Sequence, residues 1–324
     1  MSRRSKVRDA FLGLAIGDAL GVPFELVKRE DLEKDPVTDM VGNKAHNKPP
    51  GTWSDDGSMT FCTAESLLDG FDIDRMAKNY LAWFDDGYWS ADGKAFGSGG
   101  TTRAALKKIR EGHSAEGAGR TDPESNGNGS LMRVLPLVFY FDRVGIARMR
   151  DMVFEVSSIT HGHNVACLAC YYYVRFAMHL IRDADKFDTY HALCHEFNGL
   201  NFAMTFSNEN HVMIENDFRA FDRLTKSDIS KLPSSAIRSG SYVVDSLEAA
   251  IWCLMTSNSY KETVLKAVNL GGDSDSTAAI AGGLAGILYG LDDVPEAWMQ
   301  KLARKDDIEK LCDEFTYAFL NWYQ

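Results

Sequence analysis

Apolar residues recur every three to four positions along most of the chain, the spacing of helices that bury one face. Alternating apolar and polar positions, which are typical of strands, are scarce. The spacing predicts helices over 4–20, 58–70, 73–85, 101–111, 130–141, 145–159, 163–183, 187–197, 243–256, 260–269, 275–290 and 305–322. We therefore expect an all-α fold that forms one compact domain over residues 1–324.

Two segments interrupt the helical pattern. Residues 112–129 are rich in turn-forming Gly, Asn, Ser and Pro, which indicates a surface loop or a loop that lines a site. Residues 199–241 mix polar and aromatic residues, and the part around 199–235 is interpreted as a peripheral insertion that shapes access to a site. Neither segment has the low complexity of a flexible linker between domains.

The most apolar stretch, Thr277 to Leu291, contains glycines at 282, 286 and 290. It is shorter than the roughly 20 residues that a membrane-spanning helix needs, and it ends at Asp292. The three glycines fall on one helical face, so they predict close packing of this helix against a neighbour rather than a membrane span.

Composition excludes some partners. With a net charge of -11 and a pI near 5.2, the surface repels phosphate backbones, so we expect no nucleic-acid partner. A local pocket for a small phosphate-bearing ligand stays compatible with this charge. The six cysteines show no disulfide framework, and the Cys167-x-x-Cys170 pair lacks zinc-finger companions, so we expect a reduced, cytoplasmic protein.

Two acidic clusters each stand immediately before a predicted helix, Ser54-Asp55-Asp56 and Asp273-Ser274-Asp275-Ser276. Such residues are ordinary helix N-caps, and that interpretation remains open. Each cluster nevertheless carries two carboxylates where one side chain would suffice as a cap. Carboxylate and hydroxyl oxygens suit Mg²⁺ or Mn²⁺, and four carboxylates are enough for a two-metal centre.

Two glycine-rich segments also precede predicted helices, Gly97-Ser98-Gly99-Gly100-Thr101-Thr102 and Asn126-Gly127-Asn128-Gly129-Ser130. Glycines before a helix N-terminus expose backbone N–H groups that suit phosphate oxygens. Neither segment is a dinucleotide fingerprint or a P-loop, so plain turns remain an alternative. A diphosphate ligand beside two metal ions would use both glycine segments and both acidic clusters.

In combination these residues resemble the ADP-ribosylglycohydrolase family over nearly the whole chain and in the same order. The segments that carry the resemblance are Gly13–Glu25, Trp53–Asp56, Gly127–Arg133, Ile159–His161, Ser239–Ala250 and Gly271–Ser276. The resemblance implies an all-α domain with a dinuclear Mg²⁺ or Mn²⁺ centre at the base of a cleft. It implies that the metals are held by Ser54, Asp55, Asp56, Asp273, Asp275 and Ser276.

The resemblance also implies roles for other residues. Glu25 would lie near the metals, and Glu25, Asp55 or Asp56 would transfer protons. The substrate would be bound by Gly99, Gly100, Thr101, Asn128, Gly129, Ser130, His161 and Tyr242. Many relatives carry Thr at the positions of Ser54 and Ser276, and many bacterial relatives carry Asp where this chain has Gly97.

We expect hydrolysis of the bond between ADP-ribose and a protein side chain, with ADP-ribosylarginine as the preferred substrate. Serine-linked or O-acetyl ADP-ribose, or another small ADP-ribosyl conjugate, is the first alternative. A second alternative is a protein that binds ADP-ribose or neutralises an ADP-ribosylating enzyme or toxin. A dinuclear phosphohydrolase, which would release AMP, is a weaker alternative.

Overall fold

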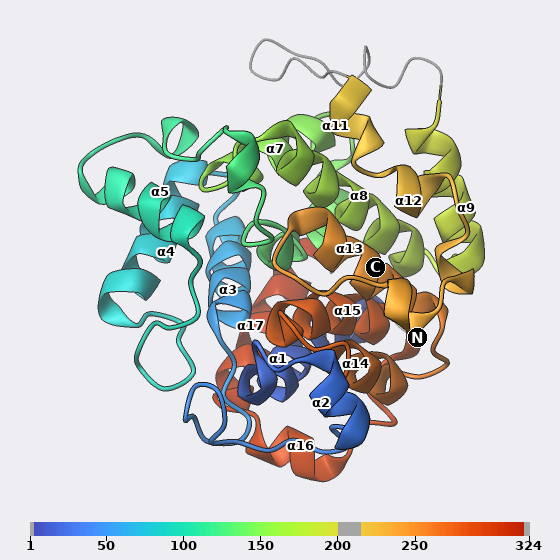
Figure 1. The fold of residues 1–324 in the computed structure, drawn as a ribbon. Helices are drawn as coiled ribbons and strands as arrows, with labels where there is room; N and C mark the ends of the chain where they lie inside the picture. The colour runs from blue at the N-terminus through green and yellow to red at the C-terminus, as the bar shows by residue number, and fades with distance from the viewer. Residues whose placement is uncertain (1–2, 200–214, 321–324) are drawn as a thin grey trace.

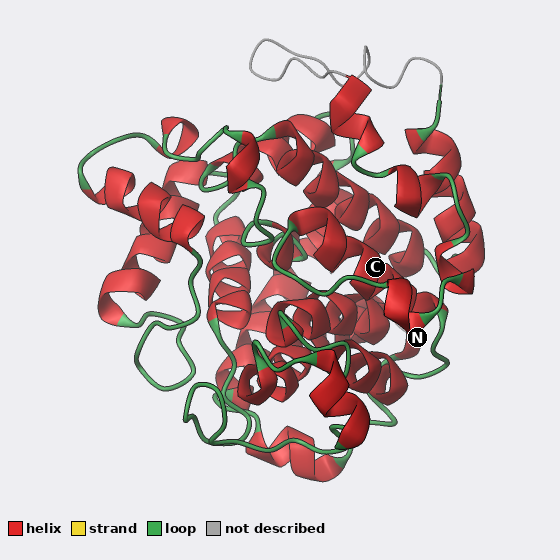
Figure 2. Cartoon of the chain, in the orientation of Figure 1, coloured by secondary structure: helices red, strands yellow, loops and turns green. Residues whose placement is uncertain are grey.

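The computed structural model describes residues 3–199 and 215–320. Helices and connecting loops make up this part of the chain, and it contains no β-strand (Figures 1 and 2). Two isolated backbone bridges, Arg120 with His161 and Gly127 with Tyr242, join loops rather than strands. The prediction of an all-α fold is confirmed.

The main helices follow the predicted order closely. The α-helices are α1 (Arg3–Gly21), α2 (Arg29–Lys34), α3 (Asp55–Leu68), α4 (Ile73–Asp86), α5 (Gly100–Arg110), α6 (Pro136–Val144), α7 (Met149–Ser158), α8 (Asn164–Ile181), α9 (Lys186–Phe197), α11 (Glu215–Arg219), α12 (Asp222–Thr225), α13 (Val243–Met255), α14 (Tyr260–Val268), α15 (Ser274–Tyr289), α16 (Glu296–Lys301) and α17 (Lys305–Leu320). Short 3-10 turns occur at Val22–Phe24, Ala115–Gly117, Pro123–Ser125, Leu131–Arg133, Ile229–Lys231 and Ser234–Ala236.

Helices α1 and α15 pack against each other at the centre of the molecule (Figure 1). Small residues permit this contact: a β-carbon at Gly13 would lie 2.6 Å from the carbonyl oxygen of Gly282. Side chains at Gly17 and Gly286 would overlap backbone atoms of the opposite helix. Two of the three glycines predicted to allow close packing do so, whereas Gly290 ends the helix as its C-cap. The missing side chains therefore allow the two backbones to come into direct contact.

The other helices surround this pair. Helices α13, α14 and α8 pack on α15, and α17, α14 and α3 pack on α1. Their apolar faces merge into one continuous core that includes the fully buried Trp53, Trp83 and Trp298. The first turns of α3 and α15 both begin beside α1, which places the two acidic clusters close together.

Some boundaries differ from the predicted ones. The helix predicted over 130–141 is a 3-10 turn at Leu131–Arg133 followed by α6, because Pro136 lacks a backbone N–H and occupies the first position of a new helix. The helix predicted over 145–159 begins only at Met149. Helices α2, α11, α12 and α16 were not predicted, since at four to six residues they are too short to show periodicity.

The insertion predicted around 199–235 lies partly outside the described residues, which omit 200–214. Its described remainder forms α11, α12 and two 3-10 turns at the edge of the molecule near α9 (Figure 1). Within the described residues, no helix combines the length and apolar character that a membrane crossing requires.

Candidate active site

Three helices bring carboxylates together at one point. One carboxylate oxygen from each of Asp18 on α1, Asp56 on α3 and Asp275 on α15 lies within 4.8 Å of the other two. All three side chains are buried. The two acidic clusters, 220 residues apart along the chain, therefore meet around an acidic group that comes from a third helix.

Asp18 was not singled out as a functional residue from the sequence. Its carboxylate accepts hydrogen bonds from the backbone N–H of Ser54 at 2.9 and 3.0 Å and from that of Gly57 at 2.9 Å. It therefore satisfies N–H groups at the start of α3 that have no partner within the helix. The available signal was its position: a charged residue inside the apolar run Leu14-Ala15-Ile16-Gly17-Asp18-Ala19-Leu20 is expensive to bury without a purpose.

Hydroxyl groups from both clusters converge on Asp56. Ser54 Oγ donates to Asp56 Oδ2 at 3.0 Å, and Ser276 Oγ donates to the same oxygen at 3.3 Å. The other oxygen, Asp56 Oδ1, is buried and has no hydrogen-bond partner. A buried carboxylate oxygen without a donor is costly, and a hard cation is the partner that suits it. The residues present therefore fit a divalent metal ion.

The capping interpretation holds for one cluster only. Ser54 accepts a hydrogen bond from the backbone N–H of Asp56 at 3.3 Å and so caps α3 as well. Asp273 occupies the N-cap position of α15 but makes no capping hydrogen bond with its side chain. Its Oδ2 instead accepts a hydrogen bond from Asn128 Nδ2 at 2.8 Å. Asp273 is thus oriented by the second glycine-rich segment, Asn126–Ser130 (the second glycine loop), and not by its own helix.

The electrostatics of the cluster favour either protonation or a bound cation. Burial raises the pKa of Asp55, Asp56 and Asp275 well above the usual range, and neighbouring carboxylates raise these pKa values further. Burial also raises the pKa of Asp18 to about 7, although hydrogen bonds from Gly57 and Ser54 oppose the shift. A divalent cation would lower these pKa values, because it favours the charged form of each carboxylate.

Glu25 follows the 3-10 turn after α1, and its carboxylate lies near that of Asp275. Its carboxylate is hydrogen-bonded to Nε2 of His46, and the Glu25, His46 and Asp275 ligand atoms lie within 4.8 Å of one another. The imidazole of His46 packs on the ring of Phe96, 5.3 Å between ring centroids. A loop 21 residues further along the chain therefore holds Glu25 beside Asp275.

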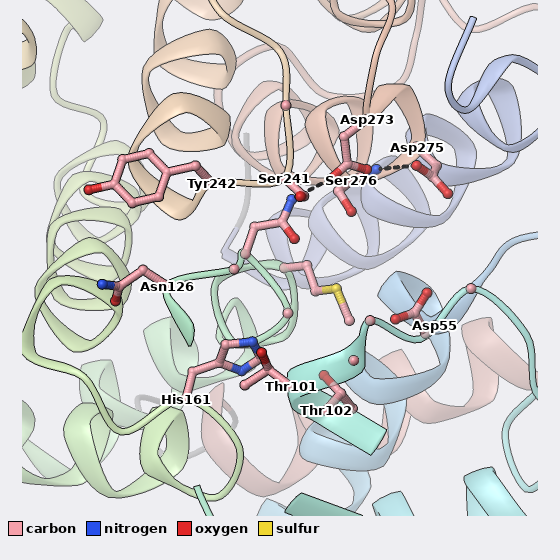
Figure 3. Close-up of a pocket in the computed structure, with 18 of the residues that line it drawn as sticks. Asp55, Thr101, Thr102, Asn126, His161, Ser241, Tyr242, Asp273, Asp275 and Ser276 are labelled. Atoms are coloured by element: carbon pink, nitrogen blue, oxygen red, sulfur yellow. Dashed lines mark hydrogen bonds between the residues drawn. The ribbon is translucent and has the colours of Figure 1, made fainter. Parts of the chain in front are cut away.

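A cavity of about 770 Å³ opens over this cluster of carboxylates. Figure 3 shows Asp55, Asp273 and Asp275 on one side of it, with Asn126 and Tyr242 on the opposite side. Predicted site residues that line it are Glu25, Asp55, Gly99, Gly100, Thr101, Asn128, Gly129, His161, Tyr242, Asp273, Asp275 and Ser276. Ser54, Asp56 and Ser130 are buried and are not among its lining residues.

The glycine segments form one wall of the cavity. Gly99 is the N-cap of α5, and a β-carbon at Gly99 or Gly100 would meet open space, so backbone N–H groups can be approached there. A β-carbon at Gly129 would lie 2.9 Å from both the His161 ring and the Thr102 hydroxyl. This second loop is anchored by Asn128, whose backbone N–H donates to the Ser241 carbonyl oxygen at 3.0 Å.

His161 and Tyr242 differ in environment. His161 is buried, and burial together with the positive charge of Arg133 lowers its pKa to about 3, so its ring is neutral. Thr160 Oγ1 lies 2.8 Å from its Nδ1. Tyr242, at the N-cap of α13, is 39% exposed and is therefore available to a ligand at the cavity mouth.

The backbone conformation at Gly97 and the neighbouring Asp55 side chain both favour glycine at this position. Its φ of +89° lies in the left-handed region, and a β-carbon there would overlap Oδ1 of Asp55. The absence of a side chain allows this loop to pack directly against a predicted metal ligand. An aspartate at this position would require a different backbone or a displaced Asp55.

Comparisons with known proteins identify the family to which the chain is similar. The model of the family described as ADP-ribosylglycohydrolase matches residues 1–324. ADP-ribosylarginine hydrolase Tri1 of Serratia proteamaculans is 33% identical over 96% of this chain and 79% of its own length. ADP-ribosyl-[dinitrogen reductase] glycohydrolase of Rhodospirillum rubrum is 29% identical over 93% and 91%. A solved ADP-ribosylglycohydrolase-related protein complex has a TM-score of 0.79 at 29% identity, covering 98% of this chain and 99% of its own.

Proposed function

Because this chain belongs to the ADP-ribosylglycohydrolase family, we propose that it removes ADP-ribose from ADP-ribosylated arginine side chains of a protein. The observation that carries the proposal is the meeting of Asp18, Asp56 and Asp275 beneath one end of a cavity whose wall is made of glycine loops. The likeness to an ADP-ribosylarginine hydrolase over nearly the whole chain supports arginine as the linkage.

The proposal assigns two divalent ions, Mg²⁺ or Mn²⁺, to the acidic end of the cavity. Their ligands would come from the two clusters: Ser54, Asp55, Asp56, Asp273, Asp275 and Ser276. When bound, the ions would supply Lewis-acid activation at the bond to be hydrolysed and would neutralise the carboxylates. The unpartnered Asp56 Oδ1 and the serine hydroxyls around Asp56 support this donor set.

The chain's own residues would perform the remaining steps. Glu25 and Asp55 line the cavity, so they can exchange a proton with a bound substrate, whereas Asp56 lies beneath the lining and is better suited to hold a cation. His46 orients the Glu25 carboxylate through its Nε2. The glycine loops at 99–101 and 128–130 would bind the diphosphate and proximal ribose through backbone N–H groups, with Ser130 beneath the lining and the other residues at the cavity surface.

Neutral His161 and half-exposed Tyr242 would line the cleft that holds ADP-ribose. A single domain over 1–324, with a peripheral insertion around 199–235, is part of the same proposal. So is a cytoplasmic setting, because all six cysteines are free thiols.

The test is a linkage-resolved hydrolysis assay. The purified chain is incubated with arginine-ADP-ribosylated protein in Mg²⁺, in Mn²⁺ or in excess chelator, and free ADP-ribose is quantified. We expect metal-dependent release, and we expect Asp55→Ala and Asp275→Ala to abolish it while leaving the helical circular-dichroism spectrum unchanged. Serine-linked and O-acetyl ADP-ribose are assayed in parallel, and preferential release from either would overturn the arginine assignment. Release of AMP would indicate a phosphohydrolase instead.

A further inference from the structure

The cavity presents an electrostatic problem for an anionic ligand. Five carboxylate side chains line it, and among the described lining residues there is no Lys or Arg. These carboxylates belong to Glu25, Asp55, Glu124, Asp273 and Asp275. His161, which also lines the cavity, is neutral because its pKa is lowered to about 3. A positive charge behind the lining would therefore favour a ligand with a diphosphate, in addition to any metal ions.

Arg133 supplies such a charge. It ends the 3-10 turn after the second glycine loop and is completely buried. Its Nη1 donates to the Gly129 carbonyl oxygen at 3.0 Å, its Nη2 donates to the Val156 carbonyl oxygen at 3.1 Å, and its Nε has no hydrogen-bond partner. The guanidinium carbon lies 4.6 Å from the centre of the Tyr80 ring. An arginine stays charged even when buried.

This buried cation lacks the usual compensation. Among the described residues, no carboxylate lies within ion-pair distance of Arg133, whereas buried charges are normally paired. The partially buried Arg223 and Arg175, by contrast, each pair with a glutamate. Carbonyl oxygens and an aromatic face solvate the guanidinium of Arg133, but its net charge remains unneutralised in the protein.

The field of Arg133 reaches the cavity. The Gly129 carbonyl group that accepts its hydrogen bond belongs to a residue of the cavity wall. Burial lowers the pKa of His161, another residue of the same wall, and the positive charge of Arg133 lowers it further. The exposed Arg103 side chain donates a hydrogen bond to the Ser98 carbonyl group, and water and salt screen its charge. The charge of the buried Arg133 is screened much less.

We propose that Arg133 is the fixed counter-charge for the diphosphate of the ligand and that it acts through the Gly129 loop without touching the ligand. This proposal rests on the proposed function for the identity of the ligand, ADP-ribose. Arg133 is accordingly a positioning residue: it orients the Gly129 peptide and holds a positive potential at the wall that faces the phosphates. Removal of a buried positive charge behind the wall that faces a dianion is expected to weaken binding by about tenfold or more.

The first experiment compares charge removal with charge retention. Affinities for ADP-ribose and for inorganic diphosphate are measured by isothermal titration calorimetry with the metal-loaded protein and its Arg133→Met and Arg133→Lys variants. We expect the methionine variant to bind both ligands at least tenfold more weakly and the lysine variant to remain within about threefold of wild type. The metal affinity of each variant is measured separately and should be unchanged.

Lys186 provides a matched control. Its ammonium group is also buried, donates to the Leu254 and Ser257 carbonyl oxygens, and belongs to a residue that does not line the cavity. Lys186→Met should destabilise the fold without changing either affinity. If it weakens ligand binding as much as Arg133→Met does, loss of a buried cation acts only through stability and the proposal is wrong.

A second pair of variants leaves Arg133 in place. Met59 Sδ lies 4.0 Å from Arg133 Nη1, so Met59→Glu would put a carboxylate against the guanidinium, and Met59→Gln has the same shape without the charge. We expect the glutamate variant alone to lose affinity for ADP-ribose, by about tenfold. This pair decides the matter if Arg133→Met does not fold.

Equal affinities of the two Met59 variants, or equal losses for the two Arg133 variants, would overturn the assignment of a counter-charge. A wild-type protein that binds neither ADP-ribose nor diphosphate would overturn it too. If the wild type binds ADP-ribose with the expected charge dependence but releases none from any linkage, the proposed function fails and the counter-charge stands.

Discussion

Replacing Asp56 with asparagine should separate the cost of the buried carboxylates from their use in metal binding. Asp56 is almost completely buried, its Oδ1 has no partner, and it lies within 4.8 Å of carboxylate oxygens of Asp18 and Asp275. Asparagine keeps an oxygen that can accept hydrogen bonds from Ser54 and Ser276 but removes the charge. We expect the metal-free variant to be at least as stable as the metal-free wild type, and the metal to stabilise only the wild type.

The magnitude follows from the separation of the charges. Two unit charges 4.8 Å apart repel by roughly 3 kcal/mol at an effective dielectric constant of about 20. Burial raises the pKa of Asp56 and so favours a protonated carboxyl group, which does not repel its neighbours, so we expect only about 1 kcal/mol of relief. For a chain of 324 residues this corresponds to a rise of roughly 1–2 °C in Tm. Metal at about 100 times its Kd stabilises the wild type by about 2.7 kcal/mol, roughly 4 °C.

The assay is thermal unfolding followed by circular dichroism, with chelator and with a series of Mg²⁺ and Mn²⁺ concentrations. Asp35→Asn, an exposed carboxylate at the end of α2, is the matched control and should behave as wild type in both conditions. A metal-free Asp56→Asn variant that unfolds more than about 3 °C below wild type, or whose Tm metal raises as much as that of wild type, would refute a metal site at Asp56.

Three further predictions concern Gly97, Gly17 and Asp18. Gly97→Ala should displace the Asp55 carboxylate and lower kcat at least tenfold, at a stability cost of about 1 kcal/mol that denaturant unfolding can measure. Gly17→Ala should destabilise the protein by about 3 kcal/mol or more in the same measurement, because its β-carbon overlaps the Ala278 backbone on α15; a loss below 1 kcal/mol would contradict the close contact of the two helices. Burial raises the pKa of Asp18 from 3.8 to about 7, and the stability this contributes is fully present below the unfolded-state pKa and is lost as the pH rises through the folded-state pKa, so the metal-free Tm should fall between about pH 4 and 7. A metal-free Tm that rises over this interval would contradict that sign.

Much of the fold followed from local sequence. The long helices α1, α8, α13 and α15 bury apolar residues at helical spacing, and this spacing is a property of the segment itself. The break before α6 could also have been read locally, because Pro136 cannot continue a helix. The short helices could not, since they hold their conformation through contacts with the rest of the molecule.

The sequence also determined which residue types could hold a divalent metal, because two clusters of carboxylates and hydroxyls precede helices. It left open whether they were caps or ligands. Only the tertiary structure decided that Ser54 caps its helix while Asp273 is turned toward Asn128. Spacing along the chain contains no information about such long-range contacts.

The partners of Asp18 and Arg133 likewise could not be predicted from the local sequence. Each is a charged residue in a short apolar context, and its local sequence gives it no partner. The close approach of α1 and α15, possible because glycines face each other, carries Asp18 to Asp56 and Asp275. The packing of the second glycine loop on the turn at Leu131–Arg133 places Arg133 behind the cavity wall. The sequence by itself determined the helices and the chemical groups, whereas the distances between those groups arose from helix packing, which depends on the whole chain at once.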